Sequence, residues 1–229
     1  MAVAINRTLT HHLPKVVFFM ESQNQPKVGK TLTMVAFSDD RPLLKPFHMF
    51  RYIGDHYLNS YDWFFIVQDT TYVRGEKLMD FVNHLSISQD LYLGKTMADV
   101  NAVYCMLGGG FILGQAVMTK IVNELDWCTK NAFSSEADDN IGRCLLHSAN
   151  LACSESVNGK QFKTYQLKQN FNFEADIKVE KKKEDFNSAI TLHSVTDPDE
   201  IYRLHRYFSE LDLTHTHKLI SEGIQQENT

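Results

Sequence analysis

The sequence predicts an α/β fold in which a sheet lies between layers of helices. Short apolar segments with the length of strands alternate with segments whose apolar residues recur at helical spacing. The chain has 229 residues, enough to bury a large core. Apolar residues make up 43% and charged residues 22%, which is typical of globular domains and excludes a generally disordered or fibrous chain.

In the first half of the chain, strands and helices alternate. Residues 15–20 predict a short buried strand, because all of them after Lys15 are apolar. Residues 31–37 predict a second strand, which is followed by a turn at 38–42. Residues 47–58 predict a helix, because Phe47, Phe50 and Ile53 follow helical spacing. The most hydrophobic strand candidate is 62–67, which is followed by a predicted helix at 75–85 and a short strand at 91–93.

The second half is richer in predicted helices. Three glycines, Gly108 to Gly110, stand where the backbone can turn tightly or approach a ligand closely. Residues 154–185 are polar and predict an insertion with a weak hairpin. The remaining predictions are helices at 115–125, 138–147 and 198–211, a late strand at 189–193, and a helical or frayed tail from residue 215.

Charge and hydropathy narrow the function classes. Lys and Arg number 23 against 28 Asp and Glu, a net charge of -5 that argues against a nucleic-acid-binding protein. No apolar stretch approaches the roughly 20 residues needed to span a bilayer, and the N-terminus has no signal-peptide pattern. Taken alone, these features indicate the cytosol.

The cysteines point to a second possibility. Four are present, Cys105, Cys128, Cys144 and Cys153, and none forms a Cys-x-x-Cys zinc pair. Two disulfides in an oxidising lumen and four reduced, buried thiols both fit this pattern. For a luminal chain, we expect an N-terminal anchor that these residues do not include.

The strongest candidate for a binding residue is Asp69, directly after the 62–67 strand. Ligands of open α/β folds lie beyond the carboxyl ends of strands, where a carboxylate can hold a hard divalent cation against a diphosphate. A turn or cap residue at this position is the alternative.

Residues 61–73, Tyr-Asp-Trp-Phe-Phe-Ile-Val-Gln-Asp-Thr-Thr-Tyr-Val, resemble the strand and D-x-D segment of the fringe-like β1,3-glycosyltransferases. The chondroitin synthase branch of that family is the most similar. The resemblance extends over nearly the whole chain, through matching stretches at 38–45, 84–94, 104–111, 138–144, 189–193 and 202–205.

This resemblance implies a GT-A fold, a nucleotide-sugar-binding sandwich with a mixed central sheet and helices on both faces. It implies that a UDP-sugar binds through Mn²⁺ and that a carboxylate removes a proton from the acceptor hydroxyl. The general base corresponds to Asp138, with Asp139 beside it, and the late-strand metal ligand corresponds to His193. The implied nucleotide-sugar contacts are Asp39, Asp40, Lys45, Asp69, Gly109 and Gly110.

The chain departs from the family pattern at the metal motif. Three successive carboxylates of active relatives correspond to Gln68, Asp69 and Thr70. The last of the three is the principal metal ligand, and a neutral hydroxyl is a poorer ligand for a hard cation. We therefore predict weak or absent binding of Mn²⁺ and UDP-sugar. Under the alternative interpretation, Asp69 and His193 only hold loops in place and Asp138 caps a helix.

The glycine segment also departs from the family, because Cys105 and the paired glycines are separated by one extra residue. The cysteine positions match the branch and favour two disulfides. Cys105–Cys128 with Cys144–Cys153 is the local pairing, although the sequence does not fix it.

The resemblance places the protein in chondroitin polymerisation, as an accessory subunit. It implies that residues 1–229 form a single GT-A-like domain, the N-terminal domain of a longer type II Golgi membrane protein. The expected partners are an active chondroitin synthase, a UDP-sugar and a chondroitin oligosaccharide. We expect no nucleic-acid partner, and contact with a membrane only through an anchor. Two alternatives stay open: an active inverting hexosyltransferase, and a cytosolic α/β protein with free thiols.

Overall fold

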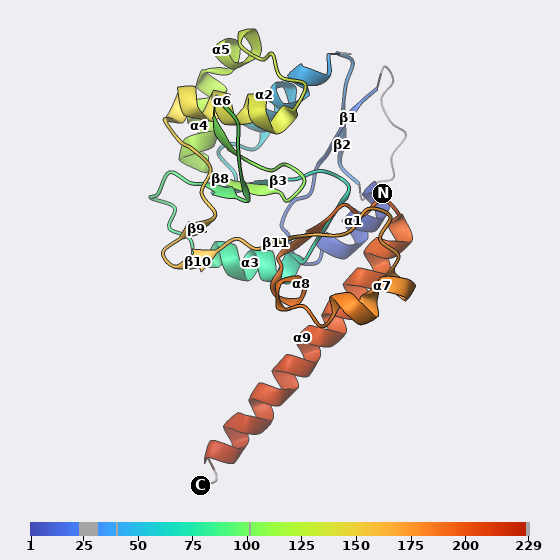
Figure 1. Cartoon of the computed structure of the whole chain (residues 1–229). Coiled ribbons are helices and arrows are strands. Elements are labelled where there is room, and N and C mark those ends of the chain that lie inside the picture. The colour runs from blue at the N-terminus through green and yellow to red at the C-terminus, as the bar shows by residue number, and fades with distance from the viewer. Residues whose placement is uncertain (23–31, 40, 101, 228–229) are drawn as a thin grey trace.

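The computed structural model describes the backbone of residues 1–22, 32–39, 41–100 and 102–227, and the side chains of these ranges as far as residue 214. The fold is α/β, as predicted, with helices on both sides of the strands (Figure 1). On one side lie α2 (Lys45–His56), α4 (Gln115–Asn123), α5 (Leu125–Lys130) and α6 (Ala137–Ala149). On the other side lie α1 (Ala2–Leu9), α3 (Gly75–Asn83), α7 (Phe173–Glu180) and α8 (Glu184–Ser188).

In the described ranges the strands form several small sheets instead of one continuous central sheet. β8 (Phe111–Gly114) lies between β3 (Trp63–Ile66) and β5 (Tyr92–Gly94), antiparallel to both. A second sheet has the order β11 (Thr164–Gln166), β12 (Thr191–His193) and β4 (Thr71–Val73), with β12 parallel to β11 and antiparallel to β4. β1 (Phe18–Glu21) pairs in parallel with β2 (Met34–Phe37).

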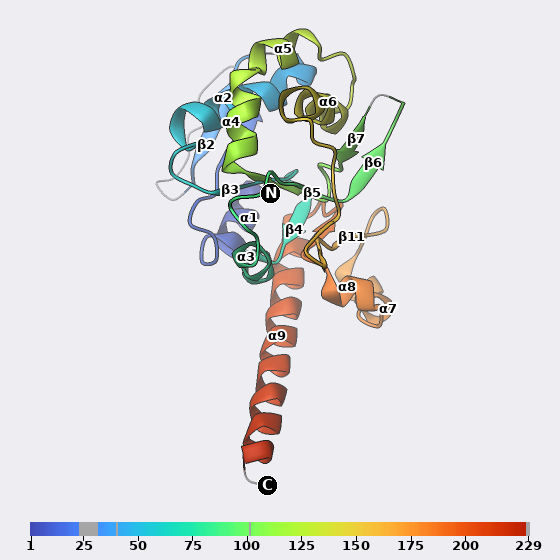
Figure 2. The ribbon, with the colours of Figure 1, turned by 90° about the vertical axis from the view of Figure 1, so that its left-hand side faces the viewer.

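Two further pairs of strands are short hairpins. β6 (Thr96–Ala98) and β7 (Val103–Cys105) pair antiparallel and project beside α6 (Figure 2). β9 (Ser156–Val157) and β10 (Lys160–Gln161) form the weak hairpin predicted in the polar insertion. β4, β6 and β7 were not predicted, although the equally short β5 and β12 were, because a local pattern identifies only some strands of three residues.

The C-terminal helix α9 (Pro198–Glu227) packs on the molecule through its first half and then continues away from it (Figure 2). Ile201, Leu204 and Phe208 are buried. Arg74, with 3% of its side chain exposed, lies over the Phe208 ring and donates a hydrogen bond to Asp212 at 2.6 Å. No helix in the described ranges has both the length and the hydropathy that crossing a bilayer requires.

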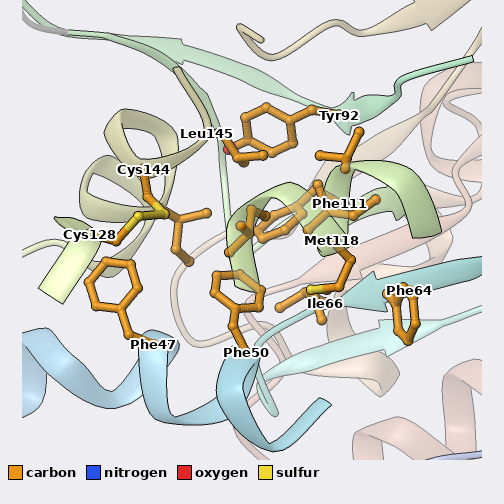
Figure 3. Packing of buried hydrophobic residues seen from close by; sticks show 14 of the residues in the cluster. Phe47, Phe50, Phe64, Ile66, Tyr92, Phe111, Met118, Cys128, Cys144 and Leu145 are labelled. Atoms are coloured by element: carbon orange, nitrogen blue, oxygen red, sulfur yellow. A yellow bond between two sulfur atoms is a disulfide. The ribbon is translucent and has the colours of Figure 1, made fainter. Parts of the chain in front are cut away.

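The main core lies between α2, α4 and α6 and the sheet of β3, β8 and β5 (Figure 3). Phe50, Phe111 and Met118 are fully buried there. The disulfide Cys128–Cys144 joins α5 to α6 at one end of this cluster.

The local disulfide pairing is wrong. Cysteines Cys105 and Cys153 form one bond and Cys128 and Cys144 the other, and no free cysteine remains in the described ranges. The reason is that the segment after α6 runs back along β7 and β5. The Cys153 amide donates to the Val103 carbonyl at 3.2 Å, which brings residues 48 positions apart into contact.

Candidate functional site

The candidate site begins where β3 ends and the chain crosses to the other sheet. Gln68 and Asp69 are exposed, Thr70 is half-buried, and Thr71 starts β4. The prediction that the hydrophobic strand runs directly into a polar segment is confirmed, with β3 ending at Ile66.

His193 reaches the same place from β12. It pairs in register with Thr71, because β12 and β4 are antiparallel. A Cβ added at Gly108 would lie 3.4 Å from Gln68 Oε1 and 3.5 Å from His193 Nδ1. A Cβ at 108 would thus be in ordinary van der Waals contact with both side chains, so Gln68, Gly108 and His193 meet at one place.

The imidazole of His193 is held in its neutral form. Only 4% of the residue is exposed. Burial, and secondly the positive charge of Lys95, lower the pKa of His193 below its ordinary value of 6.5. Its Nε2 is buried and makes no hydrogen bond within the described part of the chain. A neutral imidazole nitrogen of this kind can accept a proton or bind a metal.

The donor set fits a manganese ion poorly. Across the described ranges, no three His, Cys, Asp or Glu side chains gather closely enough to hold a metal. Asp69 supplies the only carboxylate of the 68–70 segment, and it is exposed. Gln68 and Thr70 add neutral oxygens, whereas hard divalent cations prefer anionic ones.

Two threonines fix the glycine segment between β7 and β8. The Thr71 hydroxyl donates to the Gly108 carbonyl at 2.7 Å, and the Thr191 hydroxyl donates to the Gly109 carbonyl at 2.6 Å. Both threonines are buried. Gly110 has a φ of +78°, and a Cβ there would lie 2.5 Å from the Phe65 ring.

The three glycines differ in their surroundings. Gly109 and Gly110, the two that the resemblance implied as nucleotide-sugar contacts, are buried against Thr164 and Phe65. Gly108 faces Gln68 and His193, and sequence reasoning did not select it. Its only signal was its place as the first of three glycines.

Asp138 lies in the first turn of α6 and is half-buried. Its Oδ2 accepts a hydrogen bond from the Leu107 amide at 3.3 Å. The helix begins at Ala137 with Glu136 as its N-cap residue, so the alternative in which Asp138 is the cap is wrong. Burial, and after it the charge of Asp138, raise the pKa of Tyr104.

The backbone of Leu107 connects Asp138 to the Gln68 side of the site. The Leu107 backbone N–H donates to the Asp138 carboxylate. The Leu107 carbonyl accepts from the backbone N–H of Gln68 at 3.4 Å and from the backbone N–H of Gly110 at 3.1 Å. The candidate base and the candidate metal segment therefore lie on opposite sides of one loop.

Asp139 has a different environment from its neighbour. It is 5% exposed, and its Oδ2 lies 3.7 Å from Nη2 of Arg143, whose guanidinium lies 3.3 Å from the centre of the Phe133 ring. Its Oδ1 is buried and has no hydrogen-bond partner within the described part of the chain, so Asp139 remains a candidate beside Asp138.

The third group of expected contacts lies after β2. Asp39 accepts hydrogen bonds from Arg41 Nη2 at 2.6 Å and from His48 Nε2 at 2.9 Å. The Arg41 side chain and amide, together with His48, hold the pKa of Asp39 far below its usual range. Lys45 forms an ion pair with Glu21. Asp40, also an expected contact, lies outside the described residues.

A cavity of about 1130 Å³ reaches Gln68, Asp69 and the Glu21–Lys45 ion pair, whereas Asp39, Asp138 and His193 are not among its lining residues. Its polar lining includes Glu21, Lys45, Gln68 and Asp69, while most of its wall is apolar. The volume suits a nucleotide-sized ligand at the polar end and leaves a large apolar space beside it.

Comparison with known proteins relates the chain to a family. A family model described as chondroitin N-acetylgalactosaminyltransferase matches residues 124–227. Human chondroitin sulfate glucuronyltransferase is 34% identical over 97% of this chain. The chain belongs to the chondroitin synthase family.

Other members of the chondroitin synthase family match over a similar range. Human chondroitin sulfate synthase 3 is 31% identical over 90% of the chain, and human chondroitin sulfate synthase 2 is 28% identical over 97%. The sequence alone pointed to synthase 2, also called chondroitin polymerizing factor, through the Asp-Thr-Thr-Tyr segment at 69–72, but the identity to the glucuronyltransferase is higher. The chain spans 25% to 29% of the length of these relatives.

Proposed function

We propose that this chain is a glycosyltransferase-type component of chondroitin polymerisation, with weak donor binding of its own and an accessory role. The single observation that carries the accessory role is the 68–70 segment. It offers one exposed carboxylate, Asp69, between an amide and a hydroxyl. A cation bound between Asp69 and His193 would have little negative charge to compensate it.

The same site supports glycosyl transfer as the ancestral chemistry. Bound manganese would withdraw charge from the leaving diphosphate of a UDP-sugar. Asp138, half-buried and fixed by the Leu107 amide, suits the removal of a proton from an acceptor hydroxyl. The substrates on this reading are a UDP-sugar carrying glucuronic acid or N-acetylgalactosamine and the end of a chondroitin oligosaccharide.

One observation favours an active inverting hexosyltransferase as the second candidate. His193 keeps a buried, unpaired Nε2 among the described residues and a lowered pKa, as expected of a group prepared for a ligand. In that case Asp69 and His193 hold the ion together with water.

The proposed location is the Golgi lumen, within a type II membrane protein, and the proposed partner is an active chondroitin synthase. Both disulfides support an oxidising compartment.

Calorimetric titration of the purified chain with UDP-sugar, with and without Mn²⁺, tests the proposal. We expect weak or undetectable metal-dependent binding. The double variant Gln68→Asp with Thr70→Asp should tighten Mn²⁺ binding by on the order of tenfold, about 1.4 kcal/mol, because it restores two anionic ligands.

The matched control places the same two charges elsewhere. Thr10 and Thr214 are exposed and remote in sequence from the site, so Thr10→Asp with Thr214→Asp should leave manganese affinity unchanged. Micromolar, metal-dependent binding by the unaltered chain would overturn the accessory reading in favour of the second candidate.

Co-expression with a chondroitin synthase in a secretory system tests the partner. We expect the two to purify together. Separate elution of two well-folded proteins would contradict the hetero-oligomer.

A further inference from the structure

The apolar part of the large cavity is a slot between β1 and β3, which belong to two separate sheets. Residues 14–21 line it consecutively, and so do residues 60–69. Successive side chains of a strand point to opposite faces. A strand that lines a cavity with every residue therefore presents its edge to that cavity and not one face.

The strand pairings agree with this geometry. Within the described ranges β1 pairs only with β2, and β3 pairs only with β8. β2 contributes only Phe37 to the lining, and β8 contributes only Ile112. The other edges of β1 and β3 therefore border the slot, with backbone N–H and C=O groups that no described strand pairs.

Helices close the slot above and below. Met49, Ile53 and Ile141 line it from α2 and α6, and Leu9 and Leu78 line it from α1 and α3. β1 and β3 are apolar, yet their residues are only partly buried at Phe18, Phe19, Met20 and Phe65. Side chains of a strand covered on both faces would be buried if its edge were also paired.

We infer that this slot receives one extended β-strand of a partner polypeptide, which joins the β1 and β3 edges into a continuous sheet. An edge strand with unpaired backbone groups is a template for strand addition. With two edges bordering the slot, the incoming backbone can satisfy its hydrogen bonds on both sides.

The walls also define the chemistry of that strand. Helices cover both faces, so the side chains on both faces must be apolar, and the strand is a continuous apolar run instead of an alternating one. Charged residues stand near the slot's ends: Lys15 and Asp62 precede β1 and β3, Glu21 is the last residue of β1, and Asp69 follows β3. The occupant therefore has an uncharged centre of about six residues, about 20 Å long, with polar residues at its ends.

A defined peptide tests this inference without reference to glycosyl transfer. The probe is Lys-Lys-Val-Val-Leu-Val-Val-Val-Lys-Lys, and the reporter is Trp63, which lines the slot. The chain has two tryptophans, so Trp127→Phe leaves Trp63 as the only one. We expect a blue shift of Trp63 emission on titration and at least tenfold slower hydrogen exchange at residues 18–21 and 63–66.

The control peptide has the same side chains with N-methyl groups at alternate central residues. It retains the apolar surface but loses the donors along one edge, so we expect at least a tenfold loss of affinity. Equal binding of the methylated peptide, or no binding of the unmodified peptide, overturns the inference. Concentration-dependent dimers with the same exchange protection would also overturn it, because a second copy of the chain would then fill the slot.

Discussion

The two disulfides should stabilise the fold to different extents, and the difference tests the non-local pairing. Cys105–Cys153 closes a loop of 48 residues, and Cys128–Cys144 closes one of 16. In the chain-entropy model, removing a cross-link increases the conformational entropy of the unfolded chain, and the increase is larger for a longer loop. At 25 °C this amounts to about 4 kcal/mol for the longer loop and about 3 kcal/mol for the shorter one.

The perturbation is a pair of double variants, Cys105→Ala with Cys153→Ala and Cys128→Ala with Cys144→Ala. All four cysteines are buried, so the truncated side chains leave similar cavities and the comparison isolates the loops. Urea unfolding followed by circular dichroism should give the larger loss of unfolding free energy for the first pair, by about 1 kcal/mol.

Peptide mapping under non-reducing conditions provides the direct control. We expect the fragments containing Cys105 and Cys153 to be linked, and likewise those containing Cys128 and Cys144. Linked fragments of Cys105 with Cys128 would refute the pairing, and a larger loss for the second double variant would refute the loop argument.

Three further predictions concern the glycine segment and its neighbours. Gly110→Ala should lower the unfolding free energy by about 1–3 kcal/mol more than Gly159→Ala. Both glycines have a left-handed φ, but only at Gly110 would the added Cβ meet a ring within 4 Å. Equal losses in chemical denaturation would contradict this. Thr191→Val should lower the unfolding free energy by about 1–3 kcal/mol, because the buried Gly109 carbonyl loses its hydrogen-bond donor; unchanged stability would count against a stabilising role for this hydrogen bond. Burial lowers the pKa values of His193 and His205, so below about pH 6.5 the unfolded chain binds more protons than the folded chain. Thermal stability should therefore fall as the solution is acidified through that range, and His193→Asn should make the fall smaller without removing it. An identical pH profile for variant and parent would refute the lowered pKa of His193.

The sequence predicted the elements whose apolar pattern is long or dense. β3 and α6 appear close to their predicted places, because a run of aromatic residues and a repeated 3.6-residue spacing are strong local signals. The polar segment at Gln68 was found for the same reason, as the abrupt end of the most hydrophobic strand.

Features decided by contacts between distant segments could not be predicted. The partner of Cys105 depends on how the segment after α6 returns along β7, which no local pattern encodes. The division of the strands into separate sheets and the choice of Gly108 over Gly109 as the residue facing His193 depend equally on tertiary packing. Helix α1 was missed although Ile5 and Leu9 are spaced for one face, because eight residues give only two turns of evidence.

The backbone of Leu107 has a mechanical consequence for any chemistry performed here. Its amide and carbonyl serve Asp138 and Gln68 at the same time, so neither side of the site can be repositioned alone. An insertion in this loop would shift the Asp138 side and the Gln68 side together, so a change of one residue in its length would alter both sides in one step.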